Sequence, residues 1–151
     1  MRSEKQKLKC LKLAVSNAQK HSRAGDPKKF YSQYIRYALG DFDRINFYTS
    51  KNAINLDRSN VIHDHVVPHN IVMGKLLKLN PINETNLKSI IYKYLVICKI
   101  TKEEDRKLNS AGLKSKMPMD WNEDTDSIFA RYEKVGIEIC EKRDREISFS
   151  L

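Results

Sequence analysis

The sequence lacks the features that mark membrane-spanning, secreted and disulfide-stabilised proteins. No apolar run approaches the roughly 18 residues that a helix needs to cross a bilayer. Lysines interrupt residues 1–20, where a signal peptide needs an apolar stretch. The three cysteines lie far apart and form no CxxC pair, which argues against a disulfide framework and against a cysteine zinc site. We therefore expect a cytoplasmic protein with no membrane partner.

Neither an internal repeat nor a low-complexity segment divides the chain. Its 151 residues are the length of one domain, and a hydrophobic share of 40% is enough to build a packed core. Helical spacing dominates, with β-like pieces over residues 46–49 and 61–67. We predict a mainly α fold, a single domain over residues 1–151 with about five to six helices and a small β element around residues 46–67.

The first two helices are predicted from the spacing of apolar residues and from signals at the helix ends. Residues 1–23 form the first, an amphipathic helix with a basic outer face. Its inward residues are Leu8, Leu11, Val15 and Ala18. A second helix is expected to begin at Asp26, as its N-cap, and to end at Gly40. Its inward residues are Phe30, Tyr34 and Tyr37 or Ala38.

Four further helices complete the prediction. One follows Pro68 and ends at Asn80, and the next is capped by Asn83 and carries an apolar face from Leu87 to Cys98. A third begins at a capping box of Thr101 and Glu104 and stops near Gly112, and the last runs from about Asp126 to Val135 with Ile128, Phe129 and Tyr132 inward. Residues 141–151 read as a charged tail that frays at the chain end.

The positive charge of the chain is concentrated near its start. The net charge is +9, and residues 1–29 hold nine lysines or arginines against two acids, a net +7. Such a balance favours a polyanionic partner, which we expect to be nucleic acid, DNA rather than RNA. The basic residues expected to contact it are Lys5, Lys9, Lys12, Lys20, Arg23 and, on the last helix, Arg131. A solvated face that only keeps the protein in solution is the alternative explanation, and Arg131 could equally be an ion-pair partner.

Three of the four histidines lie within the segment NVIHDHVVPHN, residues 60–70. They are His63, His65 and His69. In an extended segment alternate side chains share a face, so His63 and His65 should point together and Asp64 away from them. His69 follows a proline near a helix start, where a neutral imidazole is favoured over a charged one.

The stretch HDHVVP resembles the first motif of the HNH nucleases, also called the ββα-metal family. In that family a strand carries an Asp-His pair that is followed by apolar residues and proline. The resemblance covers about six residues and implies that Asp64 binds a divalent metal, Mg²⁺ or Mn²⁺, while His65 activates water as the general base. We place His63 beside it as an assisting group and His69 as a further metal ligand. The second ligand that the family carries on a following helix is not identified in the sequence.

Two other interpretations of the histidines remain open. His63, His65 and His69 could together hold zinc, with Cys98 or an acid as fourth ligand, if the turn at Pro68 folds His69 back. Alternatively, one histidine caps a helix or pairs with a buried carbonyl while the others are solvated.

Two functions therefore stand as hypotheses. The first is an HNH-like metal-dependent endonuclease that hydrolyses nucleic-acid phosphodiesters with His65 as base and Asp64 as ligand. The second is a non-catalytic basic helical protein that binds nucleic acid or a protein partner, in the manner of a phage or plasmid regulator. The sequence alone leaves open whether the protein is an enzyme.

Overall fold

The first helix, α1 (Glu4–Arg23), begins after Ser3, which caps it. A computed structural model describes residues 2–140 of the chain, and the predicted tail over residues 141–151 lies outside them. Ser3 accepts a hydrogen bond from the backbone of Gln6 and donates its own backbone N–H to the Gln6 side chain, so each satisfies an otherwise unpaired N–H. The predicted inward residues are all buried, which confirms the amphipathic helix.

The second helix, α2 (Ser32–Gly40), follows a short 3₁₀ turn over Lys28–Phe30 and buries a different face from the one expected. Its buried residues are Ile35, Ala38 and Leu39, so of the predicted inward residues only Ala38 is confirmed; Tyr34 and Tyr37 are 70% and 79% exposed and Phe30 precedes the helix. Both sets fit helical spacing, but the aliphatic set buries no polar atom against α1. Asp26 does not cap the helix, because its carboxylate contacts the ring of His21 instead.

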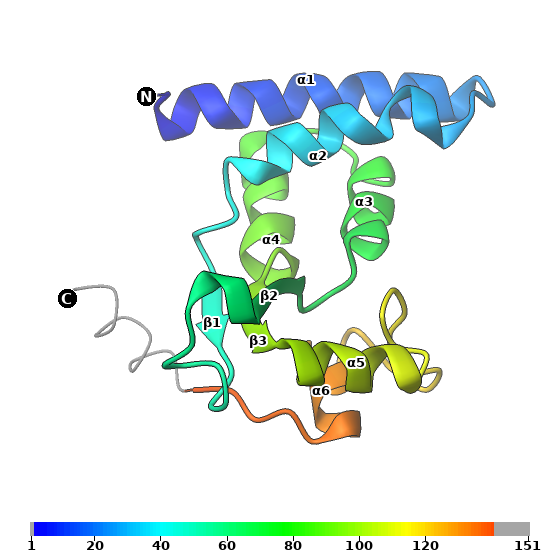
Figure 1. Ribbon diagram of the computed structural model, residues 1–151. Coiled ribbons are helices and arrows are strands. Elements are labelled where there is room, and N and C mark those ends of the chain that lie inside the picture. The colour runs from blue at the N-terminus through cyan, green and yellow to red at the C-terminus, as the bar shows by residue number, and fades with distance from the viewer. Residues whose placement is uncertain (1, 141–151) are drawn as a thin grey trace.

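Helices α3 (His69–Leu77) and α4 (Glu84–Tyr94) pack beneath α1 and α2, so that the four helices enclose the larger of two hydrophobic clusters. Figure 1 shows α1 and α2 as a layer at one end of the molecule, with α3 and α4 running from it towards the sheet. Asn83 caps α4 as predicted, since its side chain accepts from the backbone of Asn86.

A three-stranded sheet joins this helical half to the rest of the molecule. Its strands are β1 (Phe47–Thr49), β2 (Val61–His65) and β3 (Ile97–Thr101), in the order β1-β3-β2. β3 runs parallel to β1 and antiparallel to β2, with Asp64 opposite Cys98. The predicted β element over residues 46–67 is confirmed, but residues up to Cys98 do not continue α4. A short apolar run does not distinguish a buried strand from a buried helix.

Helices α5 (Lys102–Ser110) and α6 (Ala130–Val135) cover the sheet at the far end from α1 (Figure 1). The capping box of Thr101 and Glu104 is confirmed at the start of α5. α6 begins at Ala130, later than predicted, and Tyr132 is fully buried in it. The second hydrophobic cluster lies between these helices and the sheet and consists of Val66, Val96, Cys98, Ile100, Leu108, Tyr132 and Ile137.

The described residues thus form one mainly α domain with six α-helices and a small sheet, as the sequence predicts. Within residues 2–140, none of the helices combines the length and the apolar character needed to cross a membrane.

Candidate active site

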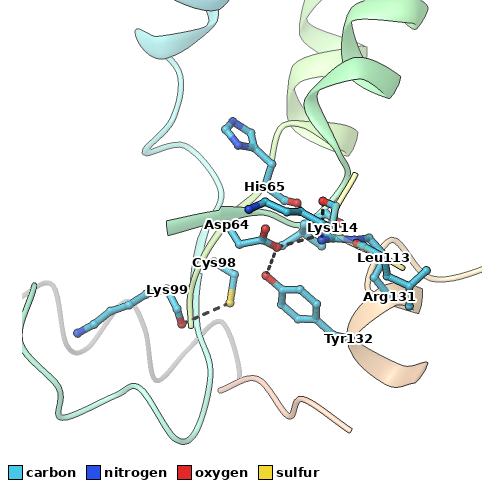
Figure 2. A network of polar contacts seen from close by, with 9 residues as sticks. Asp64, His65, Cys98, Lys99, Leu113, Lys114, Arg131 and Tyr132 are labelled. Carbon is cyan, nitrogen blue, oxygen red and sulfur yellow. Dashed lines mark hydrogen bonds and ion pairs between the residues drawn. The ribbon is translucent and has the colours of Figure 1, made fainter. Parts of the chain in front are cut away.

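The strand β2 carries the histidine motif along one edge of the sheet. Its side chains alternate, so His63 and His65 leave it on one side and Asp64 on the other. Figure 2 shows Asp64 directed towards Tyr132 while His65 points away from it. Among the described strands β2 pairs with β3 alone, so it lies at an edge of the sheet.

The carboxylate of Asp64 is held by two residues of α6. The Tyr132 hydroxyl donates to Asp64 Oδ2 at 2.7 Å, and Arg131 Nη1 donates to the same oxygen at 3.0 Å (Figure 2). Burial raises the pKa of Tyr132 well above its usual value, so the hydroxyl stays protonated and remains a donor. No described residue donates to Oδ1. The carboxylate is therefore fixed through one oxygen and has the other available.

Arg131 is fully buried, which corrects its expected role as a contact for nucleic-acid phosphates. Besides Asp64, its guanidinium donates to four backbone carbonyls. These are His65 O at 2.8 Å, Val66 O at 3.1 Å, Leu113 O at 2.6 Å and Lys114 O at 3.1 Å. The end of β2 and the loop after α5 both present carbonyls inward, and the planar fork of an arginine satisfies them together. Arg131 therefore ties α6 to the motif strand.

His65 and His69 lie against each other, with ring centroids 5.6 Å apart in an edge-to-face arrangement. Burial lowers the pKa of His65, while the nearby carboxylates of Asp43 and Asp64 act in the opposite direction. Burial, together with the charge of Arg36, lowers the pKa of His69 to about 4, and both of its buried ring nitrogens have no partner among the described residues. Both rings are therefore neutral at pH 7, the form in which an imidazole accepts a proton or a metal.

His63 occupies a separate, exposed position on the same strand. Its ring packs edge-to-face against Phe47, with centroids 5.5 Å apart. Its pKa is lowered by desolvation and by nearby cationic side chains, Arg44 first among them. Within residues 2–140, no three His, Cys, Asp or Glu side chains come close enough together to hold an ion. The structure thus does not gather the three histidines into a zinc-type cluster.

A cavity of about 520 Å³ brings most of the motif together with residues that the sequence did not single out. Its wall includes His63, Asp64, His65 and His69 from the predicted set, and Arg36, Asp105 and Lys114 in addition. Asp105 lies on the first turn of α5, one residue beyond the capping box. Arg36 and Lys114 are exposed cations at the wall. The cavity therefore combines carboxylates, neutral imidazoles and positive charge.

The path of the chain explains how Asp105 reaches this cavity. β2 pairs antiparallel with β3, and β3 continues directly into α5, so strand, strand and helix form one unit. The helices α3 and α4 are inserted between the two strands. The helix that follows Asn83 precedes β3 in the chain, whereas the helix that follows β3 directly is α5. The capping box at Thr101 was the available signal.

The basic residues predicted on the first helix all lie on its outer surface. Lys5, Lys9, Lys12, Lys20 and Arg23 are exposed. Arg23 donates to the side chain of Gln19 at 3.2 Å, its neighbour one turn earlier. The expected cationic face is therefore present on α1.

No protein-family model, curated protein or solved structure that was compared with the chain matches it.

Proposed function

We propose that the protein is an HNH-like, metal-dependent endonuclease that hydrolyses nucleic-acid phosphodiesters, with His65 as general base and Asp64 as metal ligand. The observation that carries the proposal is the β2–β3–α5 unit, because it brings Asp64, His65 and Asp105 to the wall of one cavity. The resemblance of HDHVVP to the ββα-metal family also implies a site that is shared by two strands and a helix.

The donor groups of the cavity suit Mg²⁺ or Mn²⁺. Mg²⁺ is commonly bound through one or two carboxylates, with waters and substrate phosphates completing its shell. Asp64 would contribute Oδ1, since Arg131 and Tyr132 hold Oδ2 and orient it, and Asp105 is the second carboxylate of the cavity. His69 is neutral and its ring nitrogens have no partner among the described residues, but it is not gathered with the two carboxylates, so the carboxylates, waters and the substrate phosphate would hold the ion. A bound ion would polarise the phosphate and stabilise the leaving oxygen.

The chain itself supplies the proton acceptor. His65 is neutral at pH 7 and half-buried, so it can take the proton from an attacking water. The imidazolium that forms is favoured by the charge of Asp43, the largest of the influences that raise its pKa. Arg36 and Lys114 are the cations of the cavity wall that suit the phosphate of the substrate.

A second candidate, a nucleic-acid-binding protein without chemistry, is favoured by one specific observation. Asp64 is engaged by the buried Arg131, which is also what a purely structural ion pair would look like. In that case the exposed cations of α1 would bind nucleic acid and the cavity would have no catalytic role.

The test is cleavage of plasmid DNA, single-stranded DNA and RNA with Mg²⁺, Mn²⁺ or EDTA. His65→Ala should slow cleavage by at least ~100-fold, the contribution of a positioned base, and leave binding unchanged. Asp105→Asn should also slow it, whereas Glu103→Gln, an exposed carboxylate variant on the same helix, should not. If wild-type protein binds nucleic acid but cleaves none with any of the metals, the nuclease proposal is refuted and the non-catalytic binding protein is favoured. Equal rates for wild type and His65→Ala would assign the base to another group.

A further inference from the structure

A groove between α1 and α2 is lined by aromatic side chains that the fold leaves uncovered. Its volume is about 480 Å³, and Tyr34, Tyr37 and Leu13 stand at its rim, 70%, 79% and 59% exposed. His21 and the buried Tyr31 also line it, with their rings stacked and their centroids 6.3 Å apart. The exposed rings of Tyr34 and Tyr37 are not part of the core, so they are available to a ligand with flat faces.

The charge around the groove determines what kind of ligand fits. Residues 1–40, which include α1 and α2, hold ten lysines or arginines and two acids, a net +8, and Arg2 in the groove wall is paired with Asp41 just beyond them. Lys9 and Lys20 flank Leu13 on the outer side of α1, because they lie four residues before and seven after it. A second copy of this surface would oppose two strongly positive faces, which is unfavourable. A polyanion is the complementary partner.

We propose that this groove binds single-stranded nucleic acid, with unpaired bases stacked on Tyr34 and Tyr37 and phosphates along the basic face of α1. The inference rests on the proposed function for the link to a substrate. Stacking is sequence-tolerant and contributes strongly for each base, but it requires exposed base faces. In a duplex, neighbouring base pairs cover those faces. The rings therefore favour a single strand, and the lysines alone would not distinguish the two forms.

The helix α2 connects this groove to the candidate active site. Tyr37 lines the groove, and the preceding residue, Arg36, lines the cavity of His65 and Asp105. Consecutive residues of one helix point about 100° apart, so the two sites open on adjacent sides of α2. A nucleic-acid strand that leaves the groove across α2 would arrive at Arg36. The groove would thus deliver a single strand to the cavity.

The experiment measures the anisotropy of a labelled oligonucleotide of about 20 nucleotides, longer than typical site sizes, alone and annealed to its complement. EDTA prevents cleavage. The single strand should bind at least ~10-fold more tightly than the duplex, and Tyr34→Ala/Tyr37→Ala should remove at least ~10-fold of single-strand affinity with little effect on the duplex. Tyr34→Trp/Tyr37→Trp should retain it. Tyr92→Ala, which truncates a 47% exposed tyrosine on α4 outside the groove, is the matched control.

Equal binding of both forms, or equal losses in the double variant and in Tyr92→Ala, would overturn the proposal. The proposal would also be overturned if the double tyrosine variant kept its affinity for the oligonucleotide but lost self-association in sedimentation. The same holds if it lost binding to anionic lipid vesicles instead. The test is separate from the nuclease test. If the protein binds single strands through the tyrosines but cleaves no substrate, the groove proposal stands and the nuclease proposal is refuted. If it cleaves nucleic acid and the tyrosine variants cleave and bind as well as wild type, the nuclease proposal stands and the groove proposal is refuted.

Discussion

Replacement of Arg131 by methionine should be among the most destabilising single changes in this protein. Methionine keeps an apolar stem of similar length but removes every donor of the guanidinium. The carboxylate of Asp64 is then left, largely buried, with Tyr132 as its one partner among the described residues, and four backbone carbonyls lose a donor. Two chain segments that α6 now holds, the end of β2 and the loop after α5, would no longer be tied to it.

The expected magnitude follows from that geometry. Removal of one partner of a buried ion pair typically costs about 3 to 5 kcal/mol, because the remaining charge is uncompensated. A domain of this size has a free energy of unfolding of about 5 to 15 kcal/mol, so the loss is a large fraction of the total. Asp64→Asn removes that charge, and the double variant should therefore cost at least ~1 kcal/mol less than the sum of the single variants.

Urea unfolding at pH 7, followed by the fluorescence of the single tryptophan, Trp121, measures these differences. Arg131→Lys keeps the charge without the planar fork and should lie between wild type and Arg131→Met. Arg106→Met, at an exposed arginine of α5, is the control and should stay within ~0.5 kcal/mol of wild type. The structural role would be refuted if Arg131→Met destabilised the protein by less than ~1 kcal/mol, additively with Asp64→Asn, and also weakened nucleic-acid binding. Arg131 would then be a phosphate contact, as predicted from the sequence.

Two further outcomes are expected. Because the pKa of His69 is lowered from 6.5 to about 4 in the folded protein, the unfolded chain takes up a proton first as the pH falls, and stability that is complete above pH 6.5 should decline towards pH 4. The shift corresponds to at most about 3 kcal/mol of unfolding free energy, which solvent screening of the partly exposed ring reduces to about 1 to 2 kcal/mol. His69→Phe should remove this part of the pH dependence of urea unfolding. An unchanged pH dependence in that variant would contradict the prediction. Conversion of Lys5, Lys9 and Lys12 to Gln should reduce the slope of log affinity for nucleic acid against log salt by about 0.7 to 0.9 for each phosphate that the protein no longer neutralises. The control Lys107→Gln, on α5, should leave the slope unchanged. Equal slopes for the triple variant and wild type would show that α1 is not part of the binding surface. Deletion of residues 1–23 is unsuitable for this purpose, since it would remove Leu11 and Val15 from the core.

The parts of the fold that could be predicted are those set by neighbours in the sequence. The capping box at Thr101 and Glu104 and the cap at Asn83 act within a single turn, so their residues specify a helix start wherever the helix packs. The inward stripe of α1 was likewise correct, because it has one apolar side and a strongly charged opposite side.

The parts that could not be predicted depend on tertiary contacts. α2 has two possible inward stripes, and only packing against α1 selects the aliphatic one with Ile35. β3 is buried on both faces over most of its length, so it shows no alternation that would reveal a strand. In both cases local spacing admits two structures of similar quality, and the rest of the fold decides between them.

The candidate site was predictable only in its first half. The motif gives Asp64 and His65 and their alternation, but the partners of Asp64 lie 67 and 68 residues further on. Nothing in the local sequence pairs Arg131 with that carboxylate, and an arginine on a helix is usually exposed. Asp105 joins the cavity only because β3 pairs with β2 before α5 begins.

The alternation along β2 also determines where the chain can change its length. One residue inserted or deleted between Val61 and His65 would exchange the two sides of the strand, placing the imidazole against Tyr132 and the carboxylate towards His69. The stretch from Val61 to Pro68 therefore has a fixed length. In the loop after α5, residues 122–126 are exposed and lie outside the cavity wall, so this part of the loop could grow or shrink without altering either side of β2. Length variation between relatives of this chain, or in engineered variants, belongs in that loop.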